Sequence, residues 1–92
     1  MDNEIFIEML KHIKSLDLRN KQLVRDQIDE YVDWLNSSLY NRHKVKYTMY
    51  IDTLNYFRRS LDREDVVELY GILSDNISLY YIMMDENGES IK

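Results

Sequence analysis

Residues whose side chains could do chemistry are few in this 92-residue chain. It contains no cysteine and two histidines, so thiol nucleophiles, disulfides and cysteine-based or three-histidine zinc sites lack their parts. Glu8 and His12 stand four residues apart, a spacing that places both on one helix face and that some metal ligands use. Because no third ligand follows in a suitable spacing, we interpret them as an exposed pair. We expect no metal and no other cofactor.

Carboxylates gather between residues 26 and 33, where Asp26, Asp29, Glu30 and Asp33 recur at helical spacing. Two acids that flank a sugar can cleave a glycosidic bond, but they need a cleft, and a small helical domain rarely leaves room for one. The chain has two glycines and lacks a glycine-rich phosphate loop. We therefore interpret the carboxylates as a solvated helix face and expect a protein that is not an enzyme.

Amphipathic helices are the elements that must position these side chains. Apolar residues recur at three- and four-residue spacing over about 2–14, 20–39, 44–59 and 62–84. The length allows one domain. We expect a single all-α domain over residues 1–84, a compact bundle of four helices joined by short loops, with 85–92 as a frayed acidic tail. A break near Gly71, a weak helix former, would give a fifth helix.

The helix starts and one apolar run allow more than one interpretation. Asp17 or Asn20 can cap the second helix by accepting a backbone N–H. Asp62 is the expected cap of the fourth helix, and Asp65 then stands in the first turn, where a carboxylate favours the helix dipole. Residues 77–84 are apolar on all sides, which indicates a central buried helix or, as the alternative, a buried strand.

Charge is arranged in blocks along this acidic chain, whose net charge is −5. A basic block lies within residues 42–63, and an acidic one follows it. The cations of the basic block could bind phosphates, and the tyrosines beside them could stack on bases, as in a nucleic-acid-binding module. The residues would be Arg42, Lys44, Lys46, Arg58 and Arg59. The alternative is that a basic third helix pairs with acidic neighbours in the bundle. We favour this alternative, because the net negative charge repels phosphate.

Aromatic and apolar side chains near the edges of the expected helix faces are the remaining signal. Such residues dominate protein interfaces, since they bury a large area at a small cost in entropy. The alternative is that they complete the core of a small bundle with wide apolar faces. The predicted partner-binding residues of this kind are Trp34, Tyr40 and Tyr56.

Nothing in the sequence predicts a membrane segment or export. No apolar run approaches the roughly 20 residues of a membrane span, and the first residues are acidic where a signal peptide is basic. The absence of cysteine fits a reducing compartment, so we expect a cytoplasmic protein. Alanine and proline are absent while Ile, Asn, Lys, Tyr and Asp abound, which indicates AT-rich codons. The expected source is a low-GC bacterium, one of its phages or an AT-rich large virus.

Two short segments, Val32-Asp33-Trp34-Leu35-Asn36 and Leu61-Asp62-Arg63-Glu64-Asp65, together with the length and the four-helix layout, resemble the small phage anti-sigma proteins. Members of that family are all-helical and bind the promoter-recognising region of the housekeeping sigma factor, largely through apolar residues of the first helix. The resemblance covers the layout of the whole chain and a handful of identities. It implies a contact surface made of Ile5, Phe6, Met9, Leu10 and Ile13. With the aromatic residues named above, the predicted partner-binding set is Ile5, Phe6, Met9, Trp34, Tyr40 and Tyr56.

Together these features predict a small non-catalytic protein that regulates or inhibits another protein. It would act sterically, by placing an apolar and aromatic helix face in a groove of its partner. The alternatives are an anti-sigma-like regulator that binds the sigma factor of a host RNA polymerase and, less favoured, the nucleic-acid-binding module. Self-association through the last helix across a two-fold axis would make a homodimer.

Overall fold

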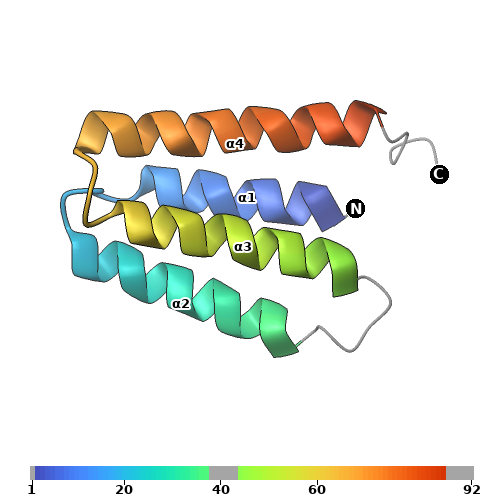
Figure 1. The fold of residues 1–92 in the computed structure, drawn as a ribbon, viewed down its shortest axis with the longest axis horizontal. Coiled ribbons are helices and arrows are strands. Elements are labelled where there is room, and N and C mark those ends of the chain that lie inside the picture. The colour runs from blue at the N-terminus through green and yellow to red at the C-terminus, as the bar shows by residue number, and fades with distance from the viewer. Residues whose placement is uncertain (1, 38–43, 87–92) are drawn as a thin grey trace.

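The computed structural model describes residues 2–37 and 44–86, with side chains described over 3–37 and 47–83. The described residues form four helices, α1 (Asp2–Ser15), α2 (Lys21–Ser37), α3 (Lys44–Ser60) and α4 (Val66–Glu86). Successive helices run in opposite directions, and the 16–20 and 61–65 connections lie at the same end of the bundle (Figure 1). The prediction of an all-α bundle of four helices is confirmed.

The four helices associate as two closely packed pairs. α1 packs mainly on α4 and α2 mainly on α3, whereas α1 meets α2 much less closely, and α3 meets α4 in the same way. Figure 1 shows α2 running obliquely away from α1 towards its C-terminal end. The seam between α1 and α2 therefore widens where the end of α2 faces the start of α1.

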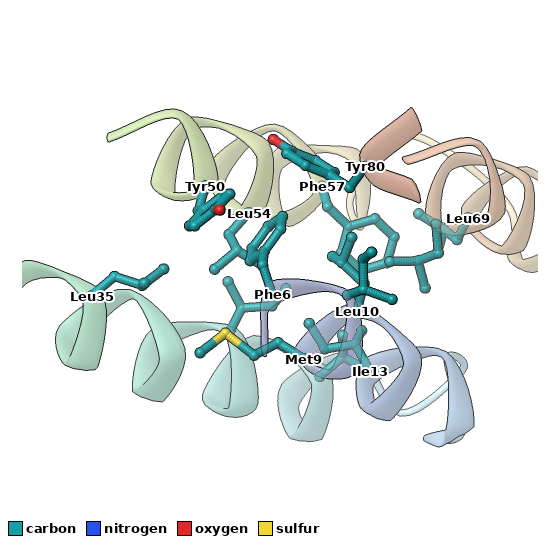
Figure 2. Packing of buried hydrophobic residues seen from close by; sticks show 14 of the residues in the cluster. Phe6, Met9, Leu10, Ile13, Leu35, Tyr50, Leu54, Phe57, Leu69 and Tyr80 are labelled. Atoms are coloured by element: carbon teal, nitrogen blue, oxygen red, sulfur yellow. The ribbon is translucent and has the colours of Figure 1, made fainter. Parts of the chain in front are cut away.

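Phe6 of α1 lies at the centre of one core shared by the helices. Its ring stacks on Tyr50 of α3 with 4.3 Å between ring centroids, and it meets Tyr80 of α4 edge-on at 4.9 Å (Figure 2). The Tyr80 hydroxyl oxygen lies 2.8 Å from Thr53 Oγ1, and the Tyr50 hydroxyl donates to the side-chain oxygen of Asn3. The polar ends of both buried tyrosines are thus paired, as burial requires.

Side-chain hydrogen bonds identify the residues that cap the N-termini of α2 and α4. Asn20 rather than Asp17 caps α2, because its side-chain oxygen accepts the N–H of the third helical residue at 3.2 Å. Asp65 caps α4 in the same way, at 2.9 Å. The prediction that Asp62 caps α4 is wrong, because residues 61–64 form turns that continue from the end of α3 and α4 begins only after them.

The apolar run at residues 77–84 is helical throughout, so the strand alternative is wrong. It is also less buried than expected, because α4 packs on its neighbours along one side only. Tyr80 reaches the core, whereas Leu79, Tyr81 and Ile82 are exposed. α4 is not broken at Gly71, and it continues to Glu86, past the expected domain end at residue 84. Residues 87–92 of the predicted tail lie outside the described residues.

α1 and α4 are also joined at the surface. The Lys11 ammonium donates to the Tyr81 hydroxyl at 2.8 Å and lies 5.3 Å from the centre of the same ring. This hydrogen bond raises the pKa of Lys11 above its ordinary value. None of the described helices is both long and apolar enough to cross a membrane.

Candidate partner-binding site

An open hollow of about 220 Å³ lies where α1 and α2 diverge. Met9 of α1 is largely buried at its base, while Trp34 of α2 keeps 47% of its surface exposed. A second hollow of about 10 Å³ continues towards α3 and is nearly filled by side chains. Met9 and Trp34 line both hollows. We call this surface the α1/α2 groove and define it by Ile5, Met9, Glu30, Tyr31 and Trp34.

The groove unites most of the predicted partner-binding residues. Ile5 is 40% exposed at its edge, whereas Phe6 is 1% exposed and contributes to the groove only from beneath, as part of the core. Tyr56 is exposed on α3 but lines neither hollow. Tyr40 lies outside the described residues. The residues brought together are Ile5, Phe6, Met9 and Trp34.

A line of aromatic rings connects Trp34 to the core. The Trp34 and Tyr47 ring centroids are 6.3 Å apart, and those of Tyr47 and Tyr50 are 5.8 Å apart. Tyr50 in turn stacks on Phe6. The Trp34 side chain is therefore positioned by α3, through Tyr47, as well as by its own helix α2.

The polar edge of the groove is acidic. Glu30 lines the larger hollow beside Tyr31. Burial, and then the negative charge of Glu30, raise the pKa of the Tyr31 phenol above its ordinary value. The phenol is thus neutral at physiological pH. Asp33 is exposed three residues further along α2, so the carboxylates of Glu30 and Asp33 lie on the same side of that helix.

Glu8 and His12 have separate partners. The Nε2 atom of His12 lies 3.2 Å from the side-chain oxygen of Gln27, and its ring stands edge-on to Tyr31 with 6.3 Å between centroids. The Glu8 carboxylate instead lies 3.8 Å from the Lys11 ammonium. Within the described part of the chain, no group of three or more His, Asp or Glu side chains is arranged to hold a metal ion.

Two arginines of the second and third helices are held by ion pairs. The Arg58 guanidinium donates to both carboxylate oxygens of Asp29, at 2.9 and 3.3 Å, and so joins α3 to α2. Arg25 pairs with Asp62 at 3.1 Å. The contact between Arg58 and Asp29 agrees with the alternative in which the cations of α3 pair with acidic neighbours in the bundle. In the rest of the predicted basic block, Arg59 is exposed, while Arg42 and the side chains of Lys44 and Lys46 lie outside the described residues.

Burial also separates the residues that the anti-sigma resemblance implicates. Leu10 and Ile13 are fully buried with Phe6, and Met9 is nearly so, which leaves Ile5 as the member with a large exposed fraction. Residues of α2 that the sequence reasoning assigned to other roles line the groove instead. Glu30 was expected on a solvated helix face, and Tyr31 belongs to the apolar repeat that predicts a helix over residues 20–39. The signal available for Tyr31 is its three-residue spacing from Trp34, which places both on one edge of α2.

The groove is thus an apolar hollow with one acidic edge, built on a tyrosine-rich core. In comparisons with known proteins, no family model, no curated protein and no solved structure matches the chain.

Proposed function

We propose that this protein is a small, non-catalytic regulator or inhibitor that binds another protein sterically through the α1/α2 groove. One observation carries the proposal. Trp34 is half-exposed beside an apolar hollow of about 220 Å³, and it is held there by ring contacts rather than projecting alone. A large aromatic side chain at a surface depression is the type of residue that supplies most of the binding energy in protein interfaces.

The chemistry of the groove supports binding. Met9 and Trp34 offer apolar surface, and Tyr31 offers an uncharged phenol. Seating an apolar side chain of a partner there would remove apolar surface from water, at about 25 cal/mol per Å². The hollow is smaller than the roughly 300–1,000 Å³ of typical small-molecule pockets, which favours a protein side chain over a metabolite. The cytoplasm of a bacterium, or of a phage-infected one, is the setting that the composition favours.

Substitution of Trp34 by alanine tests the proposal. A tagged wild-type protein should capture a partner from a host lysate, and Trp34→Ala should reduce the affinity for it by about 30-fold, the loss of roughly 2 kcal/mol that defines an interface hot spot. Tyr56→Ala is the matched control, because Tyr56 is equally exposed but lies outside the groove. It should bind as the wild type does.

The contrary outcome is equally clear. If Trp34→Ala lowers the melting temperature strongly but leaves the affinity for the captured partner unchanged, Trp34 serves the fold and the groove is not the binding site. Equal losses in Trp34→Ala and Tyr56→Ala would likewise remove the groove's special role.

A further inference from the structure

Among the described side chains, no lysine or arginine pairs with the carboxylates beside the groove. Asp26, Glu30 and Asp33 are exposed at positions i, i+4 and i+7, which form one row along the outer side of α2. Asp26 and Glu30 accept hydrogen bonds from neutral glutamines, at 2.8 and 3.4 Å. Within residues 3–37 and 47–83, none of the three carboxylates forms an ion pair with a lysine or an arginine.

This acidic row runs alongside the apolar lining. Tyr31 and Trp34 occupy the side of α2 that faces α1, and Glu30 is the member of the acidic row that also lines the hollow. The surface therefore presents an apolar strip and a parallel strip of negative charge. A helix with one apolar face and neighbouring lysines or arginines is complementary to both strips.

We infer that the α1/α2 groove takes a basic amphipathic helix of a partner protein. A large aliphatic or aromatic side chain of that helix would sit between Met9 and Trp34, and its cations would face Glu30 and Asp33. The inference rests on the proposed function and adds the chemistry of the partner. A helical ridge suits a seam between two helices, because side chains of one helix pack into the furrows between others.

Charge also argues against two other occupants. A second copy of this chain is a poor match, because it carries the same net charge of −5 and because Arg58 of its α3 is already paired with Asp29. An anionic lipid surface would be repelled by the carboxylates and by the net charge of −5.

The chain supplies its own reporter for the test. Trp34 is the one tryptophan of the sequence and lines the groove, so its fluorescence reports occupancy directly. The probe is a synthetic peptide of about four helical turns, made of leucines at three- and four-residue spacing with lysine at all other positions. The control peptide carries glutamate in place of every lysine. We expect saturable changes in Trp34 emission with the leucine–lysine peptide and none with the leucine–glutamate peptide.

Paired charge variants separate the groove from the overall charge. The double variant Glu30→Gln, Asp33→Asn should weaken binding of the leucine–lysine peptide by roughly three- to tenfold, as expected for two exposed ion pairs. The control is Glu68→Gln, Asp75→Asn, which removes the same charge from exposed positions of α4. It should change the affinity less than about twofold, because its carboxylates lie outside the groove and act only through long-range attraction, which salt screens. Circular dichroism should show the same helix content in both.

The possible results distinguish failure of the basic-helix inference from failure of the proposed function. Equal weakening by both double variants would show that the peptide responds to net charge, which overturns the inference. Equal binding of the two peptides would overturn it as well. If the wild type also captures a protein partner in a Trp34-dependent way, the proposed function stands while the basic helix is rejected. A dimer in light scattering that Trp34→Ala dissociates would put a second copy in the groove instead of a partner helix.

Discussion

Substitution of Phe6 decides whether the first helix is a core element or a contact surface. Phe6 is 1% exposed and touches the rings of Tyr50 and Tyr80, at 4.3 and 4.9 Å between centroids. Truncation of a buried phenylalanine to alanine costs about 3–5 kcal/mol, of which each aromatic pair contributes about 0.5–1.5 kcal/mol. A chain of this length has a free energy of unfolding of only about 5–14 kcal/mol. Phe6→Ala should therefore remove roughly a fifth or more of it.

Urea denaturation followed by circular dichroism measures this loss. Phe6→Leu keeps an apolar side chain but loses both ring contacts, so it should cost about 1–3 kcal/mol and remain folded enough to measure accurately. Ile5→Ala is the neighbouring control and should cost much less, because Ile5 is 40% exposed. A change of less than about 1 kcal/mol in Phe6→Ala, combined with loss of partner binding, would refute the assignment of Phe6 to the core. It would favour the contact role that the anti-sigma resemblance implies.

Three further predictions concern single sites. Asp65→Ala should lower the free energy of unfolding by about 1 kcal/mol, because it removes the cap of α4. Asp62→Ala should cost less, because it removes only an exposed ion pair with Arg25. If urea denaturation shows the larger loss for Asp62→Ala, the cap assignment is wrong. Gly71→Ala should raise the free energy of unfolding by up to about 1 kcal/mol, because a Cβ there meets no atom within 4 Å; a lowered melting temperature would show hidden strain. Burial raises the pKa of Tyr80 above its ordinary 10.0. The contribution of the neutral Tyr80 phenol to the free energy of unfolding is therefore complete below pH 10 and is lost as the pH rises through the raised pKa. Tyr80→Phe should cost about 1 kcal/mol at neutral pH and make alkaline unfolding less steep; an unchanged alkaline profile would exclude Tyr80 as its source.

The helices could be predicted from the sequence because periodicity is a local property. The repeat of apolar residues locates each helix to within a few residues and identifies the side that is buried. It does not say where the edge of that side lies. Ile5 and Phe6 are adjacent and both apolar, yet one is 40% and the other 1% exposed. The difference arises from where α3 and α4 lie around α1, which the sequence of α1 does not contain.

The cap of α4 illustrates a second limit. Asp62 and Asp65 both satisfy the local rule for a cap, since each has a suitable side chain before an apolar run. The choice depends on how α3 ends: the Ser60 carbonyl accepts backbone N–H groups of both Arg63 and Glu64, which commits the intervening residues to a turn. Asp62 is left to pair with Arg25 of α2, a contact between residues 37 apart in the chain.

The groove is a consequence of packing between helices, so its position could not be read from any single segment. It opens because α1 prefers α4 and α2 prefers α3, and the carboxylates beside it look from the sequence like any solvated helix face. What the sequence does provide is the residue types, namely an aromatic and apolar surplus near the edges of two helices. The structure adds that part of this surplus meets at one place, next to carboxylates that pair with no lysine or arginine among the described side chains.

The construction of the groove also predicts that its occupant stabilises the whole fold. Trp34 is connected through Tyr47 and Tyr50 to Phe6, so the groove keeps its shape only while these core rings are in place. A ligand that binds only the folded chain adds RT ln(1 + [L]/Kd), about 2.7 kcal/mol at a hundredfold excess over Kd. Against a free energy of unfolding of about 5–14 kcal/mol, this gain should raise the urea midpoint visibly. The leucine–lysine peptide should thus shift the midpoint in step with the occupancy reported by Trp34 emission. Full occupancy without a shift would mean that the peptide binds the unfolded chain equally well, and the groove would not be its site.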